Sequence, residues 1–129
     1  MKFETKSLPE TPDITAPDGS DVRILLSLQN GSMAHFELAT DGTSRAVAHK
    51  SVEEIWYFLG GEGEMWRKLD EYEEIVRVSA GVCITIPVGT YFQFRSLGKD
   101  SLKAVAITMP PWPGEDDAYF VSGKWRVES

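Results

Sequence analysis

The sequence has little of several residue types and patterns, and each shortage excludes a class of protein. One cysteine, Cys83, among 129 residues excludes an internal disulfide and fits a reducing compartment, so we expect a cytoplasmic protein. No apolar run approaches the ~20 residues of a membrane-spanning helix. No apolar stretch typical of a secretory signal stands near the N-terminus. We therefore expect no membrane partner.

Basic residues are also few. The 13 Lys and Arg residues stand against 20 Asp and Glu, which gives a net charge of −7. Binding to nucleic acid or to an anionic membrane relies on clustered Lys and Arg, so we expect neither as a partner. A content of 42% hydrophobic and 26% charged residues is ordinary for one globular domain. Composition thus leaves a small acidic domain whose ligand, if it has one, is a small molecule.

Long amphipathic helices are missing as well, because no stretch shows the 3.6-residue periodicity of one. Short segments rich in Val, Ile, Phe, Tyr and Trp follow one another instead, separated by turns of Gly, Asp, Asn and Ser. The nine segments are Val22–Leu28, Ser32–Leu38, Ser44–Ala48, Glu54–Leu59, Gly63–Lys68, Glu74–Val78, Val82–Pro87, Tyr91–Arg95 and Leu102–Thr108. This pattern predicts an all-β fold of antiparallel strands, a sandwich or barrel with little helix.

Prolines divide the chain into three parts within a single domain. Residues 1–20 are expected to form an extended N-terminal arm, residues 21–109 the β-barrel, and residues 110–129 a proline-rich segment that packs on the barrel. Trp112 is the large apolar anchor of this last segment. Two interpretations stay open for it: a clamp that seals one end of the core, or a lid over a pocket.

Two stretches of the sequence resemble the two motifs of the cupin superfamily. In the first, His49 stands five residues before Glu54, and Glu54 seven before Gly61, as the motif G-x5-H-x-H-x(3,4)-E-x6-G requires. In the second, Gly81–Gly89 matches the opening of G-x5-P-x-G-x2-H-x3-N. The resemblance runs over residues 42–108. It implies the double-stranded β-helix of that family, a jelly-roll barrel.

The resemblance also implies a metal site, which this sequence cannot complete. The family's ligands are three histidines and a glutamate, but two of the histidine positions are Val47 and Phe92 here, leaving His49 and Glu54. His35 is the candidate third ligand, although strand alternation does not decide which way it points. With it, the set would be two histidines and a carboxylate for one divalent ion such as Fe, Mn, Zn, Ni or Cu. The alternative is a pocket that holds no metal ion, and in that case the sequence indicates no particular cofactor.

Residues two apart on a strand share a face, so the motif positions predict which side chains point into the barrel. The ligand-binding candidates are Arg45, Val47, His49, Glu54, Trp56, Phe58, Phe92 and Phe94. Together they describe an aromatic cavity with few polar groups. An inward Arg45 would suit a carboxylate or phosphate; the alternative places it at the rim, paired with Glu53 or Glu37.

Three functions follow from these candidates. The first is a single-domain cupin that binds a small organic ligand in its aromatic cavity without the full metal site. The second is a metal-dependent enzyme, an isomerase, epimerase or oxygenase, that uses His35, His49 and Glu54, with His49 and Glu54 as the acid–base pair. The third is a barrel filled by its own side chains. The resemblance and the need to cover strand edges also lead us to expect a homodimer.

Overall fold

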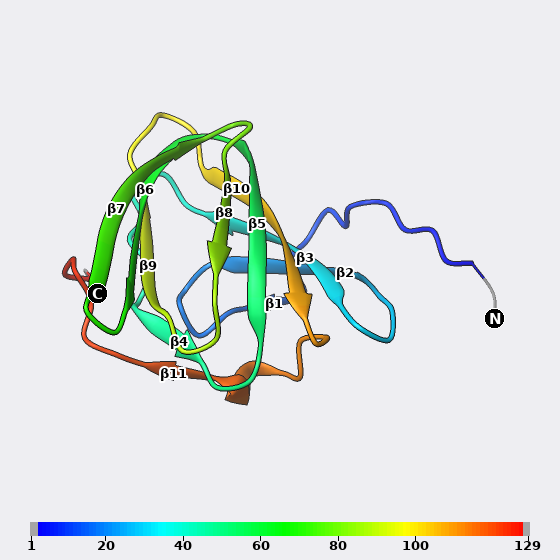
Figure 1. The fold of residues 1–129 in the computed structure, drawn as a ribbon. Helices are drawn as coiled ribbons and strands as arrows, with labels where there is room; N and C mark the ends of the chain where they lie inside the picture. Colours follow the sequence, from blue (N-terminus) through cyan, green and yellow to red (C-terminus); the bar gives the residue numbers. More distant parts are fainter. Residues whose placement is uncertain (1–2, 128–129) are drawn as a thin grey trace.

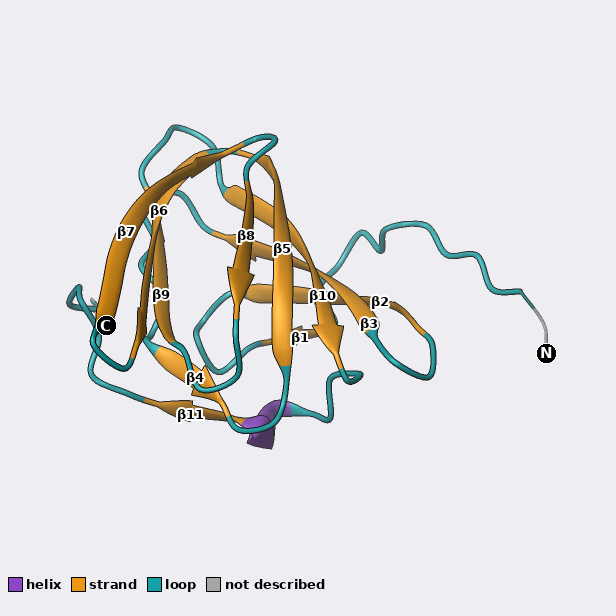
Figure 2. Ribbon diagram, in the orientation of Figure 1, coloured by secondary structure: helices purple, strands orange, loops and turns teal. Residues whose placement is uncertain are grey.

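Two antiparallel sheets face each other in the computed structural model, which describes residues 3–127 (Figures 1 and 2). The six-stranded sheet contains, in spatial order, β1 (Ile14–Thr15), β2 (Asp21–Ser27), β3 (Ser32–Leu38), β10 (Leu102–Met109), β5 (Glu53–Gly60) and β8 (Cys83–Ile86). The five-stranded sheet contains β11 (Ala118–Phe120), β4 (Val47–His49), β9 (Tyr91–Ser96), β6 (Glu62–Leu69) and β7 (Tyr72–Ser79). One 3-10 turn, η1 (Glu115–Asp117), is the helical content of the described residues, and no helix there is long and apolar enough to cross a membrane. The predicted all-β barrel with little helix is confirmed.

Each of the nine predicted β segments corresponds to a strand. The segment Ser32–Leu38 matches β3 at both ends. The segment Ser44–Ala48 shifts most, since β4 begins at Val47 and includes His49. The strands β1 and β11 were not predicted, because two or three residues are too few to show an alternating pattern.

Side chains of β5 alternate between the barrel interior and the outer surface, and those that point inward form the centre of the core. Trp56 and Phe58 are buried between the sheets, whereas Tyr57 between them is exposed. The Trp56 ring stacks on Phe36 with centroids 4.9 Å apart and meets Phe94 edge-on at 5.2 Å. Both arrangements are favourable for aromatic rings. Trp56 therefore joins the two sheets at the middle of the barrel.

The barrel interior differs between its two ends. Near the end of β5, Phe58 packs with Leu102 and Phe94 in a cluster of buried apolar side chains, as small barrels require. At the start of β5, the inward positions carry Glu54 and, opposite it on β10, Thr108. One end is thus an apolar core, and the other presents polar groups.

The N-terminal segment leads away from the barrel at its beginning and joins it before β2 (Figure 1). Arg23 on β2 donates hydrogen bonds to the carbonyl oxygens of Pro9 at 2.8 Å and Glu10 at 3.0 Å. Further along, β1 pairs with β2, with Ile14 opposite Val22. The residues just before β2 therefore form part of the six-stranded sheet.

The C-terminal segment crosses one end of the barrel, the lower end in Figure 1, where β11 pairs with β4. Beyond β11, the buried side chain of Gln93 holds the chain. Its amide nitrogen donates to the carbonyl oxygens of Ser44 and Trp125, both at 2.8 Å. Its oxygen accepts from the N–H groups of Lys124 at 2.9 Å and Trp125 at 2.8 Å. Three of these four bonds attach the segment to β9, and the fourth joins β9 to Ser44.

We expect Gln93→Leu to destabilise the protein by at least about 2 kcal/mol, because it leaves several backbone groups without a partner. Urea unfolding measures the change. Gln29→Leu is the matched control: Gln29 is exposed in a loop, and its substitution should change the free energy of unfolding by less than about 0.5 kcal/mol. Equal stability of the two variants would contradict the role given to Gln93.

Candidate functional site

A cavity lies at the polar end of the barrel. Its volume is about 40 Å³, and the rings of Phe36, Trp56, Phe92 and Trp112 form much of its lining. Glu115 also lines the cavity and is exposed, so the cavity reaches the surface there. An apolar cavity of about 150 Å³ holds benzene, and a single water needs roughly 10–15 Å³. The space therefore suits a molecule of a few heavy atoms.

Glu54 is nearly fully buried at this cavity and has a partner for each oxygen. The indole N–H of Trp56, two residues along the same face of β5, donates to Oε1 at 3.0 Å. The hydroxyl of Thr108, directly opposite on β10, donates to Oε2 at 2.6 Å. His49 Nε2 lies 3.5 Å from Oε1. These contacts compensate for the loss of water around a buried carboxylate.

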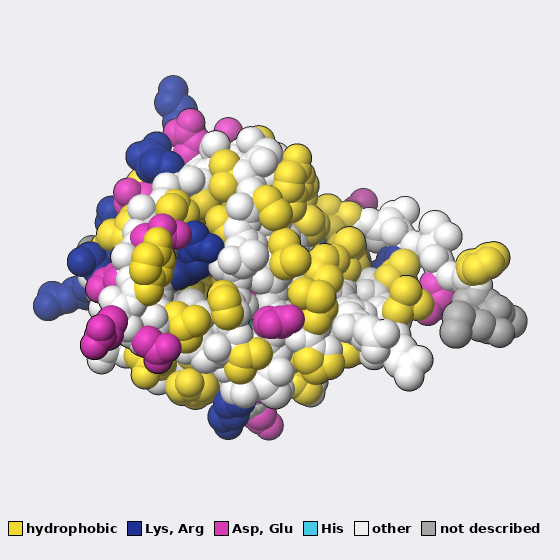
Figure 3. Space-filling view, viewed as in Figure 1, with side chains coloured by type: hydrophobic (Ala, Val, Ile, Leu, Met, Phe, Trp, Pro, Cys, Tyr) yellow, Lys and Arg dark blue, Asp and Glu magenta, His cyan; other side chains and the backbone are white. Residues whose placement is uncertain are grey.

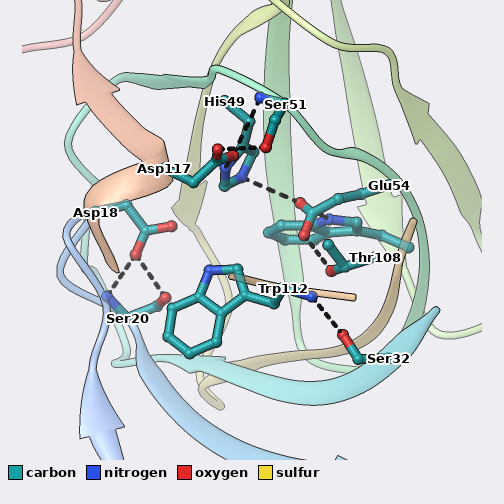
Figure 4. A network of polar contacts seen from close by, with 10 residues as sticks. Asp18, Ser20, Ser32, His49, Ser51, Glu54, Thr108, Trp112 and Asp117 are labelled. Carbon is teal, nitrogen blue, oxygen red and sulfur yellow. Dashed lines mark hydrogen bonds and ion pairs between the residues drawn. The ribbon is translucent and has the colours of Figure 1, made fainter. Parts of the chain in front are cut away.

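The other ring nitrogen of His49 faces Asp117 (Figure 4). Because β11 pairs with β4, Ala118 lies opposite His49, and Asp117 Oδ2 comes within 3.5 Å of His49 Nδ1. The Ser51 hydroxyl donates to Asp117 Oδ1 at 2.6 Å, and the Ser51 N–H donates to Oδ2 at 3.4 Å. The imidazole is thus held between two carboxylates from distant parts of the chain.

These contacts decide the charges of the pair. Burial alone would lower the pKa of His49, but the contact with Glu54 and its charge, followed by the charges of Asp117 and Asp18, raise it above the ordinary value. Burial would likewise raise the pKa of Glu54, but His49 and the hydrogen bonds from Thr108 and Trp56 lower it. The site favours an imidazolium beside a carboxylate.

Asp18 adds a third carboxyl group. It lies in the turn before β2, is buried, and lines the cavity. Its Oδ1 accepts hydrogen bonds from the N–H of Ser20 at 2.9 Å and from the Ser20 hydroxyl at 2.6 Å. Burial raises the pKa of Asp18, and the Ser20 hydrogen bonds offset only part of that effect.

Most of the ligand-binding candidates from the sequence lie at this cavity. Those that line it are Val47, His49, Glu54, Trp56 and Phe92. Phe58 and Phe94 face the interior as expected, but they belong to the apolar cluster further along the strands and do not line the cavity. Counting every second residue along a strand correctly identified the side chains that face the barrel interior. It could not show at which residue of the strand the packed core ends and the cavity begins.

Arg45 is a correction. Its side chain is exposed, and the guanidinium carbon lies 3.6 Å from the centre of the Phe120 ring on β11, an attractive cation–π contact. Neither the inward position nor the pairing with Glu53 or Glu37 is found, and Glu37 pairs with Arg23. Side chains alternate between the two faces only within a strand. Because β4 begins at Val47, this alternation does not extend to position 45.

His35 is a second correction, because it does not face the site. Phe36 points into the barrel and stacks on Trp56, so its neighbour His35 lies on the opposite face of β3. There it is paired in register with Arg23 and Val105. Burial lowers the pKa of His35, and the charge of Arg23 acts in the same direction. The predicted set of His35, His49 and Glu54 does not form.

The remaining residues do not fit a divalent metal ion. Val47 and Phe92, at the other ligand positions of the motifs, present apolar side chains to the cavity. Both oxygens of Glu54 already accept hydrogen bonds. Residues 3–127 contain no group of three or more His, Cys, Asp or Glu side chains arranged to hold an ion. Catalytic zinc and non-haem iron sites need three protein ligands.

The sequence interpretation missed three polar residues of the site: Asp18, Thr108 and Asp117. The dipeptide Asp18-Gly19 does signal a turn, but no local pattern shows that the turn lies over the cavity. Thr108 was within a predicted strand, and only the pairing of β10 with β5 brings it to Glu54. Asp117 reaches His49 through the unpredicted strand β11.

Comparison with known proteins identifies relatives of the chain. No protein-family profile matches the sequence. The uncharacterized protein MJ1618 of Methanocaldococcus jannaschii is 31% identical over 104 residues, which cover 77% of this chain and 80% of that protein.

Two solved structures share the fold at lower identity. A structure of Streptomyces PAC13 with uridine has a TM-score of 0.72 at 16% identity, covering 94% of this chain and 92% of that one; PAC13 is described as a nucleoside dehydratase. A Klebsiella pneumoniae protein with a double-stranded β-helix domain has a TM-score of 0.72 at 12% identity, covering 95% and 100%. Identities this low establish the fold alone.

We expect Glu54→Gln to lower the pKa of His49, because the amide keeps hydrogen-bonding groups for Trp56 and Thr108 but removes the negative charge. NMR titration of the imidazole resonances measures the pKa. The chain has two histidines, so His35 serves as an internal reference. Glu53→Gln is the control, since Glu53 is exposed on the other face of β5. An unchanged pKa of His49 in the Glu54 variant would contradict the pairing.

The same variant should alter the dependence of stability on pH. The pKa of His49 in the fold lies above its ordinary value of 6.5, so its charge stabilises the fold below that pH. This contribution is lost as the pH rises through the folded pKa. The stability difference between wild type and Glu54→Gln should therefore shrink as the pH rises through that range, as urea unfolding at several pH values will show.

Proposed function

We propose that the chain, which shares the double-stranded β-helix fold and resembles the cupin superfamily in its two motifs, binds a small molecule without negative charge in the cavity beside His49 and Glu54. The observation that carries this proposal is the cavity itself. Its walls are largely apolar and aromatic, with a few polar groups among them, as is usual for sites that hold small molecules. A barrel filled only by its own side chains would leave no such space.

The charge of the lining supports a neutral or cationic ligand. Of the described residues that line the cavity, none is Lys or Arg, whereas Asp18, Glu54 and Glu115 are acidic. The one cationic group, His49, already faces Glu54 and Asp117. A carboxylate or phosphate would enter without a positive partner, which is costly in a desolvated site.

The size of the cavity supports a ligand smaller than a nucleoside. Uridine, which PAC13 holds, is larger than benzene, and a cavity of about 40 Å³ is smaller than the apolar cavity of ~150 Å³ that holds benzene. A nucleoside would therefore require the C-terminal segment around Trp112 to move outward. A compact ligand requires no such movement.

A second candidate function is a proton-transfer enzyme, such as an isomerase, that needs no metal. The observation in its favour is the raised pKa of His49, together with that of Asp18, in one cavity. Groups whose pKa values are shifted by their surroundings are common at catalytic sites. Binding remains the better supported function, because both ring nitrogens of His49 face carboxylates of the protein.

Three probes of nearly equal size and different charge test the binding proposal: 2-propanol, isopropylammonium and acetate. We expect the first two to shift the methyl resonances of Ala34 and Val47, which line the cavity, in a saturable manner. Acetate should bind at least about tenfold more weakly, equivalent to ~1.4 kcal/mol of unfavourable charge interaction. Adding a chelator should leave all three titrations unchanged. Preferred binding of acetate would contradict the proposal.

Ala34→Val is the matched variant for these titrations. Its extra methyl groups extend into the cavity, so binding of 2-propanol should be lost while the fold remains. Ala39→Val is the control, because Ala39 is exposed; its binding should equal that of the wild type. If Ala34→Val binds 2-propanol as well as the wild type does, the probe lies elsewhere.

We further propose that the outer face of the six-stranded sheet binds a second copy of the chain. Support comes from the exposed apolar side chains there: Ile55, Tyr57 and Leu59 on β5 are between 41% and 47% exposed, and Met33 on β3 is 38% exposed. Figure 3 shows hydrophobic side chains gathered over this part of the surface. Such a patch is typical of an interface between proteins.

Sedimentation equilibrium tests the dimer. We expect the wild type to sediment as a dimer and Tyr57→Glu as a monomer, because the substitution places a charge within the apolar face. Tyr72→Glu is the control: Tyr72 is 71% exposed on β7 of the other sheet, and its substitution should leave the mass unchanged. A wild type that stays monomeric at high concentration would overturn the proposal.

A further inference from the structure

The carboxylate oxygens of Glu54 are engaged by protein donors, and both ring nitrogens of His49 are turned toward carboxylates of the protein. The two oxygens of Glu54 accept hydrogen bonds from Trp56 and Thr108. The two ring nitrogens of His49 lie 3.5 Å from Glu54 and from Asp117; Nδ1, the nitrogen on the Asp117 side, is buried and makes no hydrogen bond to the part of the chain that the structure describes. These groups orient one another rather than a ligand. A ligand that needs a polar contact has to find it elsewhere in the lining.

Asp18 offers that contact. It is 6% exposed, and both hydrogen bonds to its side chain, from the N–H and the hydroxyl of Ser20, end on Oδ1. The hydrogen bonds found among residues 3–127 include none to Oδ2. In Figure 4 this second oxygen points toward the space between His49 and Trp112, both of which line the cavity. The side chain is thus fixed on one oxygen and presents the other to the cavity.

Charge balance indicates the protonation state of Asp18. Glu54 and Asp117 already face the single cation of the site, His49. A third buried carboxylate would have no positive partner, and an unpaired buried charge takes up a proton instead. Burial of Asp18 and the nearby charge of Glu54 raise its pKa, in agreement with this argument.

We infer that Asp18 is a neutral carboxylic acid that donates a hydrogen bond from Oδ2 to an oxygen atom of the ligand. This inference rests on the proposed function and defines its ligand further. The ligand is an uncharged carbonyl or hydroxyl compound whose oxygen faces Asp18 and whose apolar part contacts the rings of Phe36 and Trp56. Asp18 then selects for the oxygen, and the aromatic lining selects for the apolar body.

Two probes and three variants test the role of Asp18 by the methyl resonances of Ala34. The probes are 2-propanol, which has a hydroxyl oxygen, and xenon, which has none. We expect Asp18→Ala to weaken binding of 2-propanol about 5- to 10-fold and to leave xenon binding unchanged. Asp18→Asn should bind 2-propanol within about twofold of the wild type, because its amide still donates a hydrogen bond. Asp21→Ala, at an exposed position, should bind both probes normally.

The outcomes separate this inference from the proposed function. Two outcomes would contradict the role of Asp18 and leave the binding function intact. In the first, Asp18→Ala binds 2-propanol as tightly as the wild type does. In the second, Asp18→Asn loses as much affinity for 2-propanol as Asp18→Ala does. If neither probe binds the wild type, the binding function fails. In that case, or if the variants do not fold, carboxyl ¹³C NMR of the wild type decides the protonation of Asp18. A pKa of Asp18 at or below its ordinary value of 3.8 overturns the inference, and a clearly higher pKa supports it.

Discussion

The hydrogen bond from the Trp56 indole to Glu54 connects the core of the barrel to its cavity. The ring is fixed by its stack on Phe36 and its edge contact with Phe94, so the direction of its N–H is fixed too. That N–H and the Thr108 hydroxyl hold Glu54 by both oxygens. A buried polar network of this kind is stable because every member has a partner. The packing of the apolar end thus determines the geometry of the polar end.

Glu54 in turn influences the charge of two other groups at the cavity, His49 and Asp18. Its carboxylate raises the pKa of His49 and, by repulsion, contributes to the raised pKa of Asp18. Asp117 approaches His49 from the opposite side through the pairing of β11 with β4. At the positions where the cupin motifs have further metal ligands, Val47 and Phe92 present apolar side chains to the cavity. Glu54 and Asp117 both face His49, whose raised pKa favours the charged imidazolium.

Much of the fold and part of the site could be predicted from the sequence, since both depend on alternation within a strand. Glu54 and Trp56 are two residues apart, so they share a face of β5 whatever the position of the strand in the sheet. The errors began where the local pattern ended. Arg45 precedes the start of β4, so counting in twos gave the wrong environment. His35 lies in a strand with apolar side chains on both faces, and only the stack of Phe36 on Trp56 shows which face is inside.

The two interpretations of the C-terminal segment are compatible, because different parts of it have different attachments. Asp117 is fixed by two hydrogen bonds from Ser51, and the end of the segment by three hydrogen bonds with the side chain of Gln93. Trp112, which lines the cavity, is attached through its backbone N–H, which donates to the hydroxyl of Ser32 at 3.0 Å. A displacement around Trp112 would therefore widen the cavity without breaking a contact that orients His49. The segment is thus attached to the barrel beyond η1, and before η1 it contributes Trp112 to the lining of the cavity.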